Sequence, residues 1–152
     1  MNIFVLDRDL VKCARSHVDS HVVKMPLESA QMLCTNLVRL RETAPYLPVH
    51  RNHLCTLWAG KSRDNFLWLA ELGLYLCEEY TFRYGKVHKC QEVIEYCISK
   101  SGVMPSGSLT KFEQAMPDEH KRCDPVEGYR EYYRQGKSHL AVWSKREKPD
   151  WY

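Results

Sequence analysis

The sequence predicts a mostly α-helical fold, a single compact domain that ends in an irregular arm rich in basic and aromatic residues. Apolar residues recur at intervals of three and four along several stretches, whereas the alternation typical of half-buried strands is nearly absent. The chain has 152 residues, of which 44% are hydrophobic and 27% charged. This length fits one domain of about 100–200 residues, and the composition excludes a chain that is disordered throughout.

Two helices are expected in the first 42 residues. The apolar run 3–6 is either a brief strand or an extended lead-in. Asp7 or Asp9 can cap a first helix, because a carboxylate accepts hydrogen bonds from the free N–H groups of the first turn. Pro26 suits the first position of a second helix that runs to about residue 42. The apolar positions that define these two helices are Leu10, Val11, Ala14 and Val18, then Leu27, Ala30, Leu33, Cys34, Leu37 and Leu40.

Helices are also expected in the middle of the chain, after a loop at Pro45 and Pro48. A short one covers 53–59 and stops at Gly60. Ser62 caps the clearest helix of the sequence, with a wide apolar stripe and a stop at Gly85. A further helix covers about 88–100 and has Cys90, Val93, Ile94 and Cys97 on one face.

The last third contains a loop, a final helix and the arm. Residues 101–111 are rich in Gly, Ser and Pro, which is typical of loops. Asp124 and Pro125 begin a last helix that Gly136 ends. The predicted organisation is therefore one domain over 1–152, with core helices in 1–100, a loop over 101–111, and the final helix and basic arm over 124–152.

The positive charge is concentrated at the end of the chain. The formal net charge is +3, yet residues 1–128 hold 16 basic and 16 acidic residues. The last 24 residues, 129–152, hold 6 basic and 3 acidic residues and 6 of the 17 aromatic residues. We call this segment the C-terminal arm. Cations suit phosphates and aromatic rings suit bases, so a polyanion is expected to bind there.

The cysteines and the hydropathy indicate an intracellular, cytoplasmic protein with no membrane segment. No run of about 18 apolar residues is present, and the start of the chain lacks the basic region of a signal peptide. The cysteines are odd in number and none forms a CxxC pair, so we expect reduced thiols scattered through the core. They are Cys13, Cys34, Cys55, Cys77, Cys90, Cys97 and Cys123.

Lys24, Glu28 and Gln31 are spaced so that they can share one helical face, provided that the helix begins early enough. Pro26 disturbs this spacing and can place Lys24 in the turn before the helix. An amine beside a carboxylate is the minimum for imine chemistry at a sugar carbon, because the amine attacks and the carboxylate moves protons. The alternative is an exposed ion pair worth about 0.3–0.5 kcal/mol.

A second polar group lies in the segment 50–53, followed by Trp58. Arg51, Asn52 and His53 could hold a phosphate, and Trp58 could stack on a base. Alternatively, Asn52 or His53 caps the short helix and Trp58 belongs to the core.

Two basic clusters follow. Arg83 and Lys86 lie at a helix end, where they could contact phosphate or simply complement the helix dipole. In the arm, basic and aromatic residues that could bind a nucleic acid alternate; the alternative is that Tyr133 and Trp143 pin the arm to the body. The predicted contacts of the arm are Arg130, Tyr133, Arg134, Lys137 and Trp143.

Cys13, His17 and His21 are spaced four residues apart and could bind zinc together with His53. No Glu follows the first histidine as in the HExxH pattern, so a plain helical face with one polar edge is the preferred interpretation, and no metal or cofactor is predicted.

Three segments resemble the pyrimidine-dimer DNA glycosylases of the endonuclease V type, in particular small bacterial and bacteriophage proteins. They are 22–33 (VVKMPLESAQML), which keeps Lys24, Glu28 and Gln31 in register, 50–58 (HRNHLCTLW) and 77–85 (CEEYTFRYG). Their order and approximate gaps agree over roughly residues 1–90. Residues 112–118 and the C-terminal arm are similar to uncharacterised bacteriophage proteins.

The resemblance implies an all-α glycosylase in which an N-terminal amine attacks the sugar C1′ of a damaged or modified nucleotide in DNA. Model α-amines have a pKa of about 7.7–8.0, which leaves a useful neutral fraction at pH 7. Glu28 takes the position of the helical carboxylate. The nucleophile is then the amine of Met1, since the bulky Asn2 favours retention of Met1, or else Lys24; the third alternative is that the chemistry is not a lyase reaction.

The other predicted site residues follow from this assignment. His53 joins the catalytic group, and Asn2, His21 and Gln31 join the residues expected to hold the substrate. The expected partner is DNA or a nucleotide, no cofactor is required, and we expect a monomer, in a bacterial cytoplasm if a phage encodes it. The alternative is a non-catalytic phage protein that binds DNA or nucleotides or counters host defence.

Overall fold

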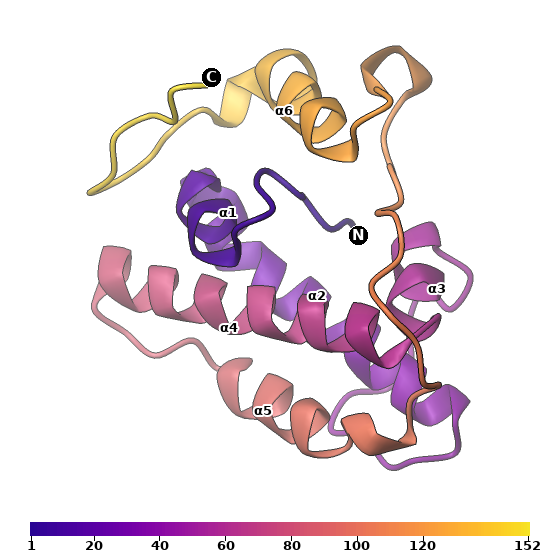
Figure 1. Cartoon of the computed structure of the whole chain (residues 1–152). Coiled ribbons are helices and arrows are strands. Elements are labelled where there is room, and N and C mark those ends of the chain that lie inside the picture. The colour runs from indigo at the N-terminus through magenta and orange to yellow at the C-terminus, as the bar shows by residue number, and fades with distance from the viewer.

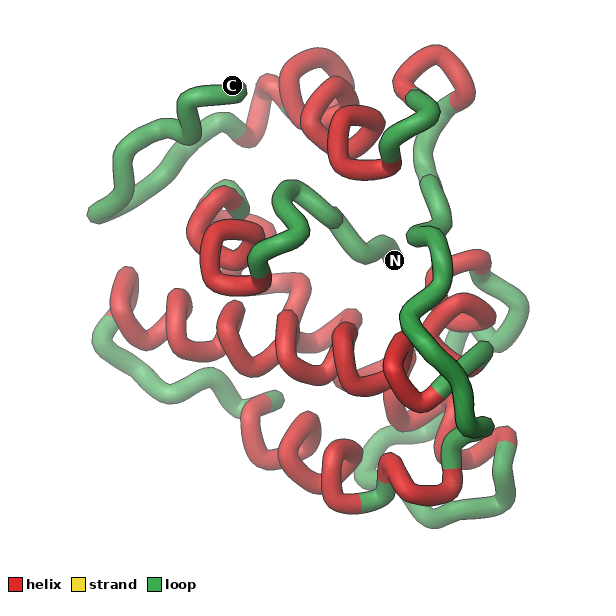
Figure 2. Tube along the Cα trace, in the orientation of Figure 1, coloured by secondary structure: helices red, strands yellow, loops and turns green.

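The structure, a computed structural model that describes residues 1–152, contains six α-helices and no strand (Figures 1 and 2). Helices account for 57% of the chain, so the prediction of a mostly α fold is confirmed. The helices are α1 (Leu10–Ser16), α2 (Asp19–Arg39), α3 (Leu54–Gly60), α4 (Arg63–Tyr84), α5 (Gln91–Ser99) and α6 (Pro125–Gly136). Short 3-10 turns cover Ser101–Val103, Asp118–His120 and Ser138–Leu140.

The two long helices, α2 and α4, pack against each other and form the centre of the fold (Figure 1). α5 packs on both of them, α1 packs on α4, and α3 packs near the C-terminal half of α2. α6 lies on the far side of the N-terminal segment, which runs between α6 and the two long helices (Figure 1). No helix is both long enough and apolar enough to cross a bilayer.

The predicted capping residues begin and end the helices as expected. The side chains of Asp9, Ser62 and Asp124 each accept a hydrogen bond from a first-turn N–H group of α1, α4 and α6. Gly85 ends α4 with a φ of 68°, a left-handed conformation that glycine adopts without a steric penalty. These boundaries are local, and the local sequence predicted them.

The predicted start of the second helix is wrong. α2 begins at Asp19, and Pro26 lies inside it. A proline inside a helix removes one hydrogen bond, here the one to the carbonyl of Val22. Burial of His21, Val22 and Met25 holds the turns around it in place. Lys24 is therefore helical, one turn before Glu28.

The N-terminal residues 1–9 form no helix and no strand, which favours the extended lead-in over the brief strand. The side chains from Ile3 to Leu6 are buried, at 5% exposure or less. Phe4 stacks on the His21 ring at 4.3 Å and meets Tyr133 of α6 edge-on at 5.3 Å. The segment thus links α2 to α6 through the core. Six of the seven cysteines are free thiols in that core, whereas Cys123 is exposed.

The C-terminal arm folds back along the body and does not extend into solvent. Its loop runs beside α1 after α6 ends (Figures 1 and 2). The Trp143 indole N–H donates to the carbonyl of Ser16, at 2.9 Å. Ser144 donates both its backbone N–H and its hydroxyl to Asp19, at 2.9 and 2.6 Å. These bonds fix the arm to the beginning of α2.

Candidate active site

A pocket of about 210 Å³ opens between the start of the chain, the first half of α2, and α6. This volume is below the roughly 300–1,000 Å³ of typical small-molecule pockets, so it fits a fragment the size of a sugar. Several predicted site residues meet there although they are far apart in the sequence. The lining residues are Met1, Asn2, Phe4, His21, Lys24, Met25, Glu28, Ala115, Tyr132 and Lys137.

The carboxylate of Glu28 lies at the centre of this group, and we call the group the Glu28 site. The residue is only 6% exposed. Its Oε1 atom is 3.7 Å from the α-amine of Met1 and 3.2 Å from Nζ of Lys24, and its Oε2 atom accepts the backbone N–H of Asn2 at 2.8 Å. One shielded carboxylate therefore faces two amines, which is the set required for imine chemistry.

Asn2 holds the start of the chain in position. Its side-chain amide donates to the carbonyl of Ala115 at 2.9 Å, and its Oδ1 atom accepts the hydroxyl of Tyr129 at 3.0 Å. The Cys55 thiol lies 3.6 Å from the same oxygen. Asn2 lines the pocket, but its side chain is hydrogen-bonded to these partners, so its predicted substrate contact stays a prediction and its observed role is to position the start of the chain.

The side chain of Met1 contributes to the same placement. It is only 2% exposed, and the hydroxyl of Thr56 lies 3.5 Å from its sulfur. Burial of the thioether leaves the α-amine as the part of Met1 that faces Glu28. No local pattern in the sequence indicates this contact, because Thr56 lies 55 positions from Met1.

His21 forms one wall of the pocket and is neutral at pH 7. Burial lowers its pKa to about 3, and the positive charges of its neighbours act in the same direction. Its Nδ1 atom is 2.6 Å from the hydroxyl of Tyr133, whose own pKa is raised well above its ordinary value by burial. The ring is thereby held by one uncharged hydrogen bond and by its stack on Phe4.

His53 caps α3 and does not line the pocket. Its Nδ1 atom accepts the backbone N–H of Cys55 at 3.2 Å, which confirms the alternative prediction of a helix cap. Burial first, and then the nearby charge of the Met1 amine, lower the pKa of His53. Of the four predicted catalytic residues, Met1, Lys24 and Glu28 therefore line one pocket. The fourth, His53, lies outside the pocket lining, at the N-terminus of α3.

The remaining residues of that segment divide between surface and core. Arg51 and Asn52 are exposed in the loop before α3. Trp58 is only 1% exposed, and its indole N–H donates to the carbonyl of Lys111 at 3.0 Å. Base stacking by Trp58 is therefore a wrong prediction, and its place in the core is confirmed. Gln31 is half-buried on α2 and does not line the pocket.

Arg83 belongs to a second polar cluster, which we call the Glu79 cluster: Asp19, Glu79, Arg83 and Arg146. The Arg83 side chain is fully buried and donates to Glu79 at 2.7 Å, to Asp19 at 2.8 Å, and to the carbonyls of His17 and Arg15. The predicted phosphate contact of Arg83 is wrong, because its guanidinium is fully occupied inside the protein.

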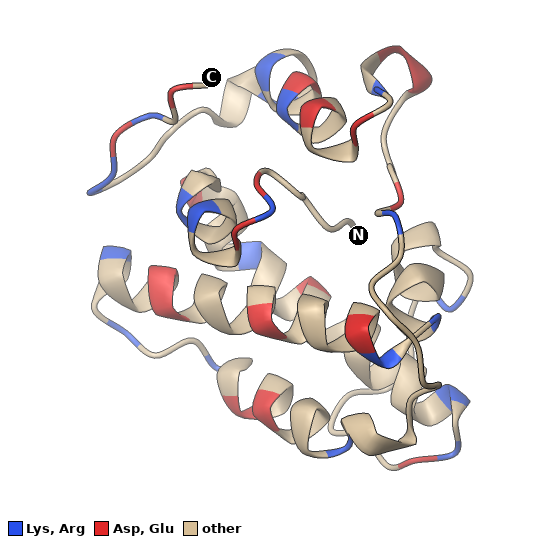
Figure 3. Cartoon of the chain, viewed as in Figure 1, with Lys and Arg blue, Asp and Glu red and all other residues tan.

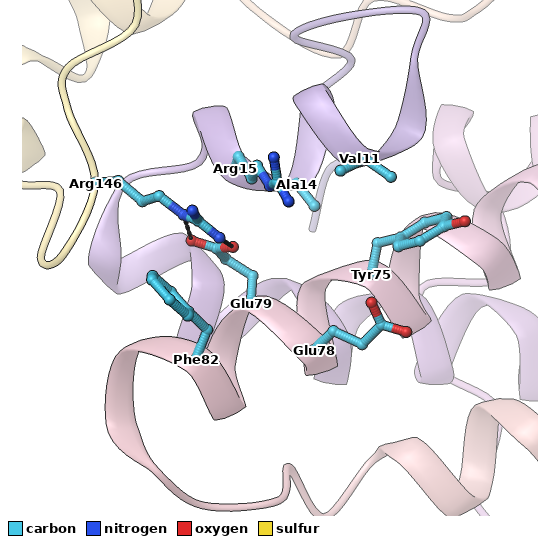
Figure 4. Close-up of a pocket in the computed structure, with 8 residues that line it drawn as sticks. All are labelled: Val11, Ala14, Arg15, Tyr75, Glu78, Glu79, Phe82 and Arg146. Atoms are coloured by element: carbon cyan, nitrogen blue, oxygen red, sulfur yellow. Dashed lines mark hydrogen bonds and ion pairs between the residues drawn. The ribbon is translucent and has the colours of Figure 1, made fainter.

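Arg146 completes this cluster from the arm, beside a second pocket of about 200 Å³ (Figure 4). Its guanidinium binds both oxygens of Glu79 at 2.9 Å and lies 3.9 Å from the centre of the Phe82 ring. Burial acts to raise the pKa of Glu79, but the hydrogen bonds from Arg146 and Arg83 outweigh it and hold that pKa below its ordinary value.

Most of the predicted nucleic-acid contacts in the arm are structural. Tyr133 is 0% exposed. Arg130 donates to the carbonyl of Leu6 at 2.8 Å and pairs with Asp7. Arg134 and Trp143 are likewise hydrogen-bonded within the fold. The alternative, an arm pinned to the body, is confirmed for Tyr133 and Trp143.

Besides Arg51, two predicted contacts keep their cations available. Lys137 lines the pocket, with its Nζ atom 5.2 Å from the centre of the Tyr132 ring. Lys86 is exposed in the loop between α4 and α5.

The zinc alternative is wrong. The Cys13 thiol donates to the carbonyl of Phe4 at 3.4 Å and accepts the N–H of Leu6 at 3.3 Å. His17 Nδ1 is 2.8 Å from the carbonyl of Cys13, and no three His, Cys, Asp or Glu side chains converge as metal ligands. Burial lowers the pKa of His17 to about 4, so it is a neutral core residue.

Comparisons of the chain with protein-family models, with curated proteins and with solved structures gave no match.

Proposed function

We propose that this protein is a glycosylase-like enzyme that attacks the glycosidic carbon of a damaged or modified nucleotide in DNA. One observation carries the proposal: the α-amine of Met1 lies 3.7 Å from the shielded carboxylate of Glu28, at the wall of a sugar-sized pocket. An amine that must attack a carbon needs a base that can take its proton directly or through one water, and Glu28 is the carboxylate placed to do so once the 3.7 Å contact shortens or a water bridges it.

In the proposed reaction, the neutral amine attacks C1′ and the bond from C1′ to the base breaks, with its electron pair leaving on the base. One amine proton passes to the departing base, with Glu28 as the relay. The bond between C1′ and O4′ then opens, O4′ takes the second proton, and an imine joins the amine to C1′. Hydrolysis of the imine by water frees the enzyme.

The same carboxylate supports strand cleavage. Glu28 can remove a proton from C2′ of the imine, the electron pair forms the C2′–C3′ double bond, and the C3′–O bond breaks as the 3′ phosphate leaves. Lys137 and Lys24 are the cations at the pocket that can balance this phosphate. His21 contributes a neutral polar wall, which can contact the sugar without adding charge.

Met1 is preferred over Lys24 as the nucleophile because its amine is held in place. Asn2 anchors the backbone next to it, and the Met1 side chain is buried. The Lys24 side chain is 65% exposed and has four rotatable bonds, so more entropy is lost when its amine is fixed for attack. In this proposal Lys24 pairs with Glu28 in the free enzyme and moves to the phosphate when DNA binds.

The test is trapping of the imine by borohydride on duplexes that carry an abasic site, a pyrimidine dimer, uracil or an alkylated base. Reduction converts the imine into a stable secondary amine, so a covalent protein–DNA complex is expected with at least one substrate. The Glu28→Gln variant is expected to lose it, while Glu113→Gln, which removes a surface ion pair with Lys61, keeps it. Base release and trapping absent from all substrates would contradict the proposal and favour a non-catalytic DNA-binding protein.

A further inference from the structure

Two basic loops contact α2 at points before and after Glu28 along the helix. One is the loop 85–90 between α4 and α5, and the other is the loop 49–53 before α3. We propose that duplex DNA lies over the mouth of the Glu28 pocket and that the two loops hold its backbone on either side of the reacting nucleotide. This inference rests on the proposed function, since it names the face and the partner for the same site.

Hydrogen bonds place both loops against α2. His88 Nε2 is 3.0 Å from the carbonyl of Val23, at the turn that carries Lys24. At the other end, Thr35 Oγ1 is 3.1 Å from both the N and the O atoms of Val49. Each attachment is a side-chain hydrogen bond to backbone: the His88 ring bonds a carbonyl of α2, and the buried Thr35 hydroxyl bonds the backbone of Val49.

The separation of these points suits a short stretch of duplex. Val23 and Thr35 are 12 residues apart in one helix, which corresponds to about 18 Å at roughly 1.5 Å per residue. At about 3.4 Å per base pair, that length covers roughly five base pairs. Glu28 lies between them, so a nucleotide in the pocket would have backbone contacts on both sides.

The cations of the two loops are free to bind phosphate. Lys86 and Lys89 are exposed in the first loop, and His50 and Arg51 are exposed in the second. The side chains of Lys86, Lys89 and Arg51 take part in no ion pair within the protein. The arm differs, because its three arginines are all paired with carboxylates.

Charge also argues against the opposite side of the molecule. The exposed acidic residues of α4 and α5 are Asp64, Glu71, Glu78, Glu92 and Glu95. Because α4 packs against α2, its exposed residues lie away from α2, and Figure 3 shows acidic residues along α4 and α5. In the same view, the loop between α4 and α5 is coloured for Lys or Arg and not for Asp or Glu. The acidic surface of α4 and α5 therefore repels DNA, whereas this basic loop attracts it.

The exposed side of α2 also offers apolar contacts beside the reaction site. Val23 and Leu27 are 46% and 40% exposed, and Leu27 directly precedes Glu28 in the chain. One residue along a helix turns the side-chain direction by about 100°, so Leu27 lies outside the pocket lining and can contact only the duplex that flanks it.

The experiment measures binding to a 15-base-pair duplex with a central tetrahydrofuran abasic analogue, by fluorescence anisotropy between 50 and 200 mM salt. The double variant Lys86→Glu with Lys89→Glu is expected to raise Kd by at least about tenfold. It should also reduce the steepness of the plot of log Kd against log salt concentration, here called the salt slope, by about 2. Arg51→Glu is expected to raise Kd about threefold and to lower the slope by about 1. The matched control, Lys145→Glu with Lys148→Glu, changes two exposed arm lysines at the same spacing and should stay within about twofold.

Equal weakening by the loop and arm variants, wild-type affinity in the loop variants, or a wild-type protein that does not bind the duplex at 50 mM salt would overturn the inference. The two proposals fail separately. Loop-dependent binding without any borohydride adduct retains this DNA face and removes the proposed reaction. If the adduct forms, but neither its yield nor the affinity for the duplex changes in the loop variants, the proposed reaction is retained and this DNA face is removed.

Discussion

The Glu28 site and the Glu79 cluster each place a buried glutamate between two cations, beside pockets of similar volume. They differ in the chemistry of the cations. Glu79 is bound by two guanidinium groups through hydrogen bonds of 2.7–2.9 Å, and a guanidinium keeps its charge at any accessible pH. Glu28 faces two amines, at 3.2 and 3.7 Å, and an amine can lose its proton and attack carbon.

This comparison separates a structural ion cluster from a reactive one. The Glu79 cluster joins α2, α4 and the C-terminal arm, and every part of it is occupied by a partner in the fold. Both sites border a pocket, but only at the Glu28 site is one of the cations, the Met1 amine, farther from the carboxylate than a hydrogen bond. We therefore expect substitutions at Glu79 to change stability, and substitutions at Glu28 to change reactivity.

The largest expected effect is that of Glu28→Gln on the reaction. Loss of the only carboxylate in the pocket should lower the rate of adduct formation on abasic DNA by about 10²–10⁴-fold, the usual contribution of a general acid or base. Binding of the tetrahydrofuran duplex should remain within about twofold. A loss of binding that matches the loss of rate would assign Glu28 a role in affinity and remove the contrast with Glu79.

Glu79→Gln is expected to destabilise the fold by about 3–5 kcal/mol, because it leaves the buried guanidinium of Arg83 with an incomplete set of partners. Urea unfolding measures this change. The rate of adduct formation per folded molecule should stay within about twofold of wild type. A stable variant with impaired chemistry would show that the Glu79 cluster serves the reaction.

Acid should destabilise the protein over two overlapping pH ranges. Burial lowers the pKa of His17 to about 4 and of His21 to about 3, so the unfolded chain binds protons near pH 6.5 that the folded chain does not. Stability is then complete above pH 6.5 and falls below it, by up to about 1.4 kcal/mol per pH unit for each histidine. The pKa values of Glu79 and Asp19 are also lowered, so their contribution is lost only below about pH 4.5.

Unfolding midpoints in urea between pH 4 and 8 measure this dependence, and His17→Gln should reduce the slope between pH 6.5 and 4.5. A slope that is unchanged in this variant would contradict a neutral buried His17.

The smallest expected effect is that of Asn2→Ala, which releases the start of the chain from Ala115 and Tyr129. Loss of these hydrogen bonds should cost about 1–2 kcal/mol of stability. It should also lower the rate of adduct formation about tenfold or more, because the Met1 amine is less well oriented. The rate is measured by adding borohydride at a series of reaction times, with the variant and the wild type compared at the same concentration of folded protein. A rate equal to that of wild type would show that Asn2 does not position the amine.

Local features were predictable from the sequence, and most long-range partners were not. The caps at Asp9, Ser62 and Asp124 and the stop at Gly85 depend on a few neighbouring residues, and all four appear as expected. Pro26 misled the prediction of α2, because tertiary burial on both sides of it outweighs one missing hydrogen bond.

For the candidate site, helical spacing and the family resemblance singled out Met1, Lys24 and Glu28, which do converge. The predicted nucleic-acid contacts of the arm were mostly wrong, because composition shows how many charges a segment has but not which residues pair with them. Arg146, for example, binds the buried carboxylate of Glu79, which is 67 positions away. The tie between His21 and Tyr133 spans 112 positions, so no local pattern could show it.

The most direct test of the central claim is peptide mapping of the borohydride-trapped adduct by mass spectrometry. The deoxyribose remnant is expected on the α-amine of the N-terminal residue, and the intact mass is expected to identify that residue as Met1. The Lys24→Ala variant is expected to form the adduct as well. A remnant found on Lys24, and lost in Lys24→Ala, would contradict the assignment of the nucleophile; the absence of any adduct on either amine would contradict the proposed chemistry itself.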